Sequence, residues 1–518
     1  MRDDGRHSGG IDPFEPPLDR SEITRSVDQL IGSGVDTLLF SAGVEGGMVI
    51  YDSRVAQKLG DNVDTWTHPV HYRDARHIRQ MIADGHDRLK LLCDRCHDKG
   101  FWFFPGLPLD IGSFISPRGH GRTSDFVLHN PQFQVGNDDD PHARNLPATR
   151  FSFLYPEVRR ERFLIFEELL SRYEVDGVEV QAEFPPLCKL KQVQELTPIF
   201  TQWLRDLRSA AQRAAQAQGR RKQIFVSLPA DAKSWKSIGY NVAVWVSEKL
   251  IDGLICTSNF AETHDQDLDL TAAVKLTRNT SCRVFAAAHS RIGGQLDQKA
   301  TQAMVWAAAA NAYHLGADGF GLDDPHWFSW PWTHEEYDTL RLLGQPGMLA
   351  GANKHYRIVS ARKGNSVPGR TVDTSSPLPR LLAEGKPVSV ALRIADDLAG
   401  WSALGRIRSV RLCIRLTNLD ASMNEVKVEL NDRRLPSTIL HLNDLTYRVI
   451  KGSAVIPFGY IFDYELTPDY YPRQGYNTVR VTLVRKDPSI EVLFEVYEVD
   501  CLIDYRLHRN FEPEPLAY

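Results

Sequence analysis

No apolar run in the 518-residue sequence approaches the ~20 residues that a helix needs to cross a bilayer, so a membrane partner is not expected. The chain also lacks an excess of one charge. Its formal net charge is −5, and basic and acidic residues are interspersed without a basic stripe. Because binding to a phosphate backbone needs such a stripe, nucleic acid is not an expected partner either. With 42% hydrophobic and 25% charged residues, the composition is that of a globular protein.

Cysteine is scarce, and the seven residues present are an odd number that does not fit a disulfide framework. The N-terminal residues Met1–His7 lack the apolar segment of a secretory signal. Both absences predict a cytoplasmic protein. If a signal has been removed, the prediction changes to a secreted one.

The first part of the sequence, up to about residue 350, alternates short β-branched or aromatic runs with segments of helical period. This alternation is typical of βα units, and eight such units indicate a closed (β/α)₈ barrel, or TIM barrel, of the α/β class. The predicted strands are Arg2–His7, Thr37–Ala42, Phe101–Pro105, Gly177–Phe184, Ile224–Leu228, Gly253–Thr257, Arg283–Ala288 and Gly319–Asp323.

The remaining sequence has a different pattern. Residues 351–380 are rich in Gly, Ser, Pro and Lys and are predicted to form a linker. In residues 381–518, strand-like segments are separated by turns and no long helical pattern occurs, which predicts a β-sandwich of jelly-roll-like architecture. Within it, Asn477–Lys486 and Ile490–Ile503 are expected to pair as a hairpin.

The fourth predicted strand carries the strongest chemical signal. Glu179, Gln181 and Glu183 alternate with apolar residues, so they share one face of the strand and are expected to point into the barrel. Two carboxylates enclosed there are costly, and crowding is expected to raise the pKa of one of them. A carboxylic acid protonated near neutral pH, together with a second carboxylate, is what hydrolysis of a glycosidic bond requires. The alternative is that these residues form a structural polar layer inside the barrel. This alternative has more weight for Glu179, which lies deeper, than for Glu183.

Two stretches resemble known glycosidases. The pattern Asp176-Gly-x-Glu179-x-Gln181-x-Glu183 resembles the DGxDxDxE strand of family 18 chitinases, in which the last Glu is the general acid. The residues 155–159 (YPEVR), a following helix and 173–177 (YEVDG) are also similar to bacterial glycosyl hydrolase-like barrels. The resemblance implies a glycoside hydrolase fold with Glu183 as the acid. Gln181 replaces the Asp that polarises the substrate acetamide in chitinases, so it is expected to bind a sugar hydroxyl instead.

The other candidate residues follow from strand ends, where barrel enzymes place their sites. An Asp-Gly pair opens the fourth, sixth and eighth strands, and one shared register points Asn259 and Asp323 inward. Asp323 is the predicted nucleophile or base, with Asp324 as the alternative. For each of the two, the competing interpretation is an Asp that caps the turn and has no catalytic role. The segment Gly106–Arg150 is long for a loop and is expected to cover the site. The predicted catalytic residues are Glu183, Asp323 and Glu179; the predicted substrate-binding residues are Gln181, Asn259, His289, Asp324, Asp110, Arg6, His7, Trp235 and Trp327.

Three functions fit this pattern. The first is a glycoside hydrolase that cleaves an oligo- or polysaccharide by carboxylate acid/base catalysis, with carbohydrate as partner and with no cofactor or metal. The second is a metal-dependent sugar isomerase, epimerase or lyase, in which Glu179, Glu183, His289 and Asp323 hold a divalent ion. The third is a non-catalytic glycan-binding barrel. The sequence leaves association into a homo-oligomer open.

Overall fold

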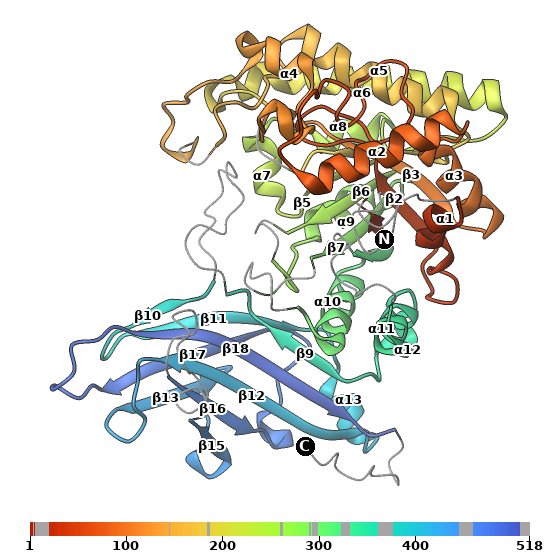
Figure 1. The fold of residues 1–518 in the computed structure, drawn as a ribbon. Helices are drawn as coiled ribbons and strands as arrows, with labels where there is room; N and C mark the ends of the chain where they lie inside the picture. The colour runs from red at the N-terminus through yellow and green to blue at the C-terminus, as the bar shows by residue number, and fades with distance from the viewer. Residues whose placement is uncertain are drawn as a thin grey trace.

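The computed structural model describes residues 1–3, 5, 20–143, 146–183, 187–258, 263–289, 292, 299–322, 332–360, 377–444 and 459–507. These residues form two domains. A barrel domain of helices around a parallel sheet lies above a domain of antiparallel sheets, and helices α10 and α11 lie on the side where the two domains meet (Figure 1).

The barrel predicted from the sequence is confirmed. Eight parallel strands pair in chain order from β1 to β8 and form a nearly closed barrel. The sixth and seventh strands have their predicted bounds, whereas β3 runs on to Pro108 and the described β1 comprises Arg2 and Asp3 alone. The strands are β1 (Arg2–Asp3), β2 (Thr37–Ser41), β3 (Trp102–Pro108), β4 (Gly177–Gln181), β5 (Gln223–Pro229), β6 (Gly253–Thr257), β7 (Arg283–Ala288) and β8 (Gly319–Leu322).

Helices cover the outside of the barrel. Two of them end at glycines with positive φ, Gly100 at 81° and Gly316 at 94°, a conformation that glycine adopts without strain. The longest, α6, buries Phe200, Trp203 and Leu204 against the barrel, and burial of a side chain of this size contributes about 1.5–3 kcal/mol. The helices of this domain are α1 (Arg20–Asp28), α2 (Pro69–Ala83), α3 (Arg88–Asp98), α4 (Asp125–His129), α5 (Pro156–Arg172), α6 (Val193–Gln218), α7 (Ala232–Ser237), α8 (Val242–Ser247), α9 (Thr271–Thr277), α10 (Gln302–His314), α11 (His334–Leu343) and α12 (Pro346–Leu349).

The second domain is a β-sandwich with one short helix, α13 (Leu398–Ala403). One sheet has the order β10-β18-β12-β16-β15, with β9 also paired to β18, and the other has the order β11-β17-β13-β14. The strands are β9 (Lys354–Arg357), β10 (Arg380–Leu382), β11 (Pro387–Ile394), β12 (Ile407–Thr417), β13 (Glu425–Leu430), β14 (Arg433–Arg434), β15 (Leu440–Asn443), β16 (Gly459–Glu465), β17 (Gly475–Arg485) and β18 (Phe494–Tyr505).

The hairpin predicted at the end of the sandwich is wrong. β17 and β18 lie in different sheets, because both edges of β17 are already hydrogen-bonded, one to β11 and the other to β13. β18 pairs instead with β12, β10 and β9. The turn at residues 487–489 therefore leads from one sheet of the sandwich to the other.

The segment predicted as a linker contributes to the sandwich. Its residues Lys354–Arg357 form β9, which pairs antiparallel with β18. The side chain of Gln266, from the barrel domain, donates to the carbonyl oxygen of His355 at 3.0 Å and accepts from the backbone N–H of Arg357 at 2.9 Å. Ala307 of α10 is buried in the core of the sandwich. The two domains are thus in direct contact through both apolar packing and hydrogen bonds from a side chain of one domain to the backbone of the other.

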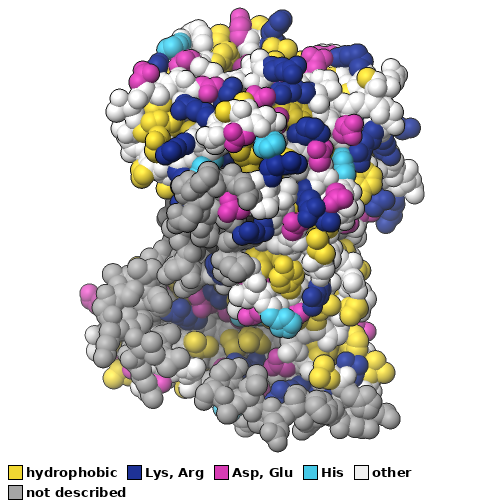
Figure 2. All heavy atoms as spheres, turned by 45° about the vertical axis from the view of Figure 1, so that its right-hand side comes forward, with side chains coloured by type: hydrophobic (Ala, Val, Ile, Leu, Met, Phe, Trp, Pro, Cys, Tyr) yellow, Lys and Arg dark blue, Asp and Glu magenta, His cyan; other side chains and the backbone are white. Residues whose placement is uncertain are grey.

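Three predictions from composition can be compared with the described residues. All seven cysteines are described, and each is buried and free of a disulfide bond. No described helix is long and apolar enough to span a bilayer. On the face drawn in Figure 2, basic and acidic side chains are interspersed over the barrel domain.

Candidate active site

The carboxylates of the fourth strand point into the barrel, as their alternation predicts. Glu179 and Gln181 belong to β4, and Glu183 follows the strand at its carboxyl end. Arg2 of β1, Ser41 of β2 and Ser227 of β5 all form hydrogen bonds with these side chains, so the side chains lie inside the sheet and not against the outer helices. All three residues are buried.

Arg2 lies between the two glutamates. Its Nη1 donates to Oε1 of Glu183 at 2.9 Å, and its Nη2 donates to Oε1 of Glu179 at 2.5 Å and to Oγ of Ser227 at 2.9 Å. The hydroxyl of Ser227 also donates to Glu179. The sequence predicted that the two carboxylates would lie close together, and the structure gives both the same cation, which compensates their buried charge.

The position of Arg2 is set by backbone pairing. Arg2 is in register with Leu39 of β2, and the backbone N–H of Leu39 donates to the carbonyl oxygen of Met1 at 2.8 Å. Because side chains alternate along a strand, this register directs Arg2 into the barrel and its neighbour Asp3 the other way. A two-residue strand therefore suffices to place the guanidinium.

Gln181 is held by the same network. Its Nε2 donates to Oγ of Ser41 and to Oε2 of Glu179, each at 3.2 Å. A Cβ at Gly106 of β3 would lie 2.7 Å from Oε2 of Glu179 and 2.9 Å from Nε2 of Gln181, so glycine at this position makes room for both side chains. Since the amide nitrogen of Gln181 is used within the protein, a sugar hydroxyl would have to donate to its carbonyl oxygen.

Asp110 is a further carboxyl group at the carboxyl end of a barrel strand, two residues after β3. It is 3% exposed, and within the described chain its Oδ1 has no hydrogen-bond partner. Burial raises its pKa to about 7, and the negative charges of Glu45 and Glu183 add to this effect. Asp110 is therefore poised to give up a proton near neutral pH, in the electrostatic field of Glu183.

The raised pKa of Asp110 makes a stability prediction. Asp110 binds its proton more tightly in the folded chain, where its pKa is about 7, than in the unfolded chain, where it is 3.8. Folding stability therefore falls as the pH rises from 3.8 towards 7, by up to about 4 kcal/mol. Asp110→Asn lacks this loss, so the variant is expected to be more stable than wild type at about pH 8 and of similar stability at about pH 4.

Urea unfolding at both pH values measures this difference. Asp139→Asn is the matched control, because Asp139 lies in the same segment but is exposed. It should follow the wild type at both pH values. The same pH dependence in wild type and in Asp110→Asn would refute the raised pKa.

Trp235 does not have its predicted place. It was expected to stack on a sugar from a loop, but it lies in α7 and is 5% exposed. Its Nε1 donates to the carbonyl oxygen of Pro229 at 2.6 Å, and its ring belongs to the barrel core. Its N–H is bonded and its ring is packed, so it has no open face for a ligand. That prediction is corrected.

The other predicted site residues divide into two groups. His289 follows β7 and is partly buried, and its backbone carbonyl accepts from Nδ1 of His264 at 2.9 Å. It thus lies at the carboxyl end of the barrel, as do Glu183 and Asp110. The remaining predicted residues lie outside the described ones: Arg6, His7, Asn259, Asp323, Asp324 and Trp327.

Sequence reasoning missed several residues of this region. Ser227 shares its strand face with Phe225, so the period-two pattern that identified Glu179 could also have found it. Arg2 and Ser41 carried no such signal, since Arg2 begins a strand of two residues and Ser41 ends a strand of five. Phe114, in the segment after β3, is 60% exposed, and an exposed ring of this kind can pack on the apolar face of a sugar.

A cavity of about 1060 Å³ opens towards the opposite end of the barrel and reaches inward as far as Arg2. Its lining includes residues that begin strands, such as Thr37, Gln223 and Arg283, and the apolar rings of Phe104 and Phe225. Barrel enzymes carry out their chemistry at the carboxyl ends of the strands, and the carboxyl groups of Glu183 and Asp110 are at that end. The candidate active site is therefore not this cavity.

No known protein-family profile matches the chain. No curated protein matches it either. Similar solved structures include a cycloisomaltooligosaccharide glucanotransferase from Paenibacillus sp. (9% identity, 94% of this chain and 56% of that one, TM-score 0.34). They also include alpha-L-fucosidase isoenzyme 2 from Paenibacillus thiaminolyticus (12% identity, 67% of this chain and 48% of that one, TM-score 0.39). A third is a glycoside hydrolase family 18 N-acetylglucosaminidase from Paenibacillus barengoltzii (11% identity, 66% of this chain and 97% of that one, TM-score 0.37). The chain thus spans about half the length of the first two, and the likeness to all three is distant.

Proposed function

We propose that this protein is a glycoside hydrolase that cleaves a glycosidic bond in an oligo- or polysaccharide. The observation that carries the proposal is a pair of carboxyl groups in opposite surroundings at the carboxyl end of the barrel. Among the described residues, Asp110 is buried and forms no salt bridge, and its pKa is about 7, whereas Glu183 accepts a hydrogen bond from the guanidinium of Arg2. Pairs of this kind divide the roles of acid and anion in glycosidases.

The roles follow from these surroundings. Asp110, protonated in part at neutral pH, is the proton donor to the glycosidic oxygen of the leaving group. Glu183, whose negative charge faces Arg2, is the anion that stabilises or traps the oxocarbenium-like centre. The chitinase resemblance implied that Glu183 was the acid. The contact with Arg2 favours the anionic role instead.

The position of Arg2 also bears on the metal-dependent alternative. A divalent ion bound between Glu179 and Glu183 would have to replace the guanidinium that both carboxylates already contact. Carboxylates that share a buried arginine have their charge compensated without an ion. We therefore place no metal ion at these two glutamates.

The test is a screen of chromogenic glycosides and natural polysaccharides, with wild type and Glu183→Gln assayed side by side. The proposal predicts turnover by the wild type and its loss in the variant. Binding of a glycan without cleavage would indicate the non-catalytic barrel. Turnover abolished by exhaustive chelation and restored by a divalent ion would indicate the metal-dependent enzyme.

A further inference from the structure

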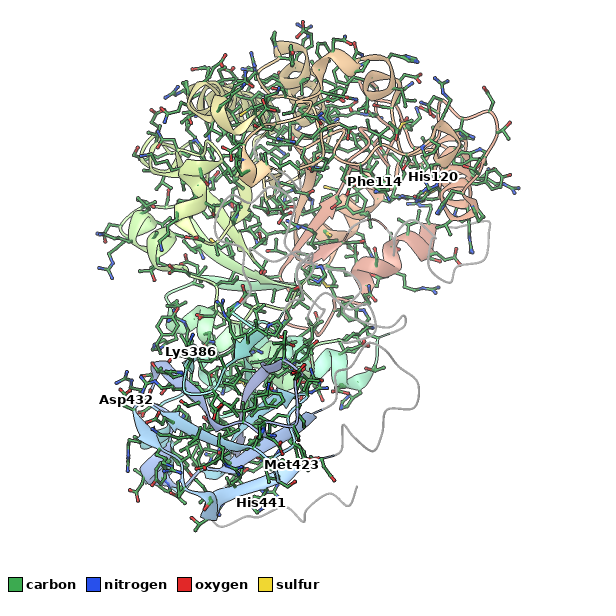
Figure 3. All side chains as sticks on the ribbon, turned by 90° about the vertical axis from the view of Figure 1, so that its left-hand side faces the viewer. Phe114, His120, Lys386, Met423, Asp432 and His441 are labelled. Atoms are coloured by element: carbon green, nitrogen blue, oxygen red, sulfur yellow. The ribbon has the colours of Figure 1, made fainter. Side chains whose placement is uncertain are left out.

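Three histidines from distant parts of the barrel domain lie together apart from the carboxylate network. His68 immediately precedes α2, His71 lies in the first turn of that helix, and His120 ends the short 3₁₀ helix Arg118–His120 in the segment after β3. Figure 3 places His120 on the barrel domain, on the same side as Phe114. All three side chains are partly buried.

The spacing of the rings is compatible with shared coordination. One nitrogen from each ring lies within 4.8 Å of the other two. The rings of His68 and His71 are stacked with centroids 3.9 Å apart, and the centroid of His120 is 4.7 Å from that of His68. Two nitrogens bound to one tetrahedral zinc ion at ~2.1 Å are ~3.4 Å apart, so the rings would have to rotate to bring their nitrogens closer together.

The hydrogen bonds of two rings favour metal binding. Nδ1 of His71 lies 3.0 Å from the backbone carbonyl oxygen of His120, to which it can only donate, and this leaves the lone pair on Nε2. Ligating histidines commonly use such a bond to a carbonyl to fix their tautomer. Nδ1 of His120 is buried and has no hydrogen-bond partner in the described chain. A buried nitrogen in this state is destabilising unless it acquires a partner.

The third ring needs a small adjustment. Nδ1 of His68 accepts a long hydrogen bond, 3.3 Å, from the backbone N–H of His71. A metal ion can take that lone pair directly, or can bind Nε2 after the proton has moved to Nδ1. Either change gives up one weak hydrogen bond at the start of α2.

The backbone around His120 holds the cluster in place. The N–H of Gly60 donates to the carbonyl oxygen of Gly121, and the N–H of Thr67 donates to that of Gly119, each at 2.9 Å. These two bonds flank His120 and attach its segment to the residues that precede His68. The ligand positions are therefore set by the fold and not by a metal ion.

The surroundings of two of the rings favour the neutral form of the imidazole. Burial lowers the pKa of His71 to about 4, and burial also lowers the pKa of His68. The positive charge of Arg122 contributes to both shifts, but this guanidinium is itself paired with Glu45 at 2.7 Å. Neutral imidazole is the form that binds metal ions.

We propose that His68, His71 and His120 form a binding site for a divalent transition metal ion, with Zn²⁺ as the expected occupant and a fourth position open to water. Three imidazole nitrogens select zinc and its neighbours over Mg²⁺ or Ca²⁺, which prefer oxygen ligands. The ion would join the segment after β3 to the start of α2. This inference does not depend on the proposed glycosidase activity, because none of the three residues belongs to the carboxylate site.

The experiment titrates tag-free, chelator-stripped protein with Zn²⁺ and with Co²⁺. We expect about one ion per chain, a Co²⁺ spectrum without a thiolate charge-transfer band, and a higher melting temperature with Zn²⁺ than without it. His120→Gln should weaken binding by roughly 100-fold or more, since even the loss of a residue that only supports a ligand costs about 10–100-fold. His129→Gln is the matched control, because His129 is exposed and lies in the same segment.

Three results would overturn the proposal. The first is no Zn²⁺ binding by the wild type. The second is unchanged binding by His120→Gln and by a second variant, His71→Gln, each shown to be folded by its melting curve without metal. The third is a thiolate band in the Co²⁺ spectrum, which would assign the ion to cysteines instead.

Discussion

Replacement of Glu183 by Gln is expected to lower kcat by roughly 10²–10³-fold while leaving the fold intact. The side chain keeps its shape and an oxygen that can accept the 2.9 Å hydrogen bond from Arg2, but it loses the charge that the reaction centre needs. The loss should appear in kcat more than in KM, because the carboxylate acts on charge that develops in the transition state. Steady-state kinetics on a substrate identified in the glycoside screen measure the effect.

The matched control for this variant is Glu174→Gln. Glu174 is exposed and precedes the same strand, so its loss should leave kcat unchanged. Comparison of the two variants separates the role of one carboxylate from a general effect of removing a negative charge. If Glu183→Gln retained most of its kcat, the proposed catalytic role of Glu183 would be wrong.

Replacement of Arg2 by Met is expected to lower the free energy of unfolding by about 3–5 kcal/mol. The variant leaves the carboxylates of Glu179 and Glu183 buried without the cation that both contact. Removal of one partner from a buried ion pair is far more costly than removal of a surface charge, because the remaining charge cannot be hydrated. Chemical denaturation near neutral pH measures the loss.

A double variant tests the reason for this loss. Glu179→Gln added to Arg2→Met removes one of the two uncompensated charges and should restore part of the lost stability, which appears as a coupling energy in a double-mutant cycle. Arg54→Met, an exposed arginine, is the matched control and should change stability little. An Arg2→Met variant as stable as wild type, or a double variant with purely additive losses, would argue against the shared cation.

The alternation of polar and apolar residues from 178 to 183 was sufficient to predict which side chains enter the barrel. The prediction holds because side chains alternate along any strand, so it needs only the knowledge that the apolar face packs against helices. The eight strands of the barrel were predicted from short β-branched or aromatic runs between helical segments. The errors lie at the strand ends, where the adjoining turns decide the last hydrogen bonds.

The pairing of strands in the sandwich shows where local pattern stops being informative. β17 and β18 are adjacent in the sequence and each reads as a strand, yet β17 has both of its edges occupied by β11 and β13. Which edges are occupied depends on β11 and β13, which both lie far from β17 in the sequence. No local signal near residues 486–493 carries that information.

Residue types and local periodicity thus specified the barrel, the sandwich and the inward-facing carboxylates of this protein. Folding supplied the relations between residues remote in the chain: Arg2 reaches Glu179 across a sequence separation of 177, and His120 meets His71 across 49. It also buried Asp110 near Glu45 and Glu183, which raises its pKa to about 7. The reason is that charge compensation, burial and ligand geometry depend on distances in space, whereas a sequence pattern reports only the neighbours along one strand or helix.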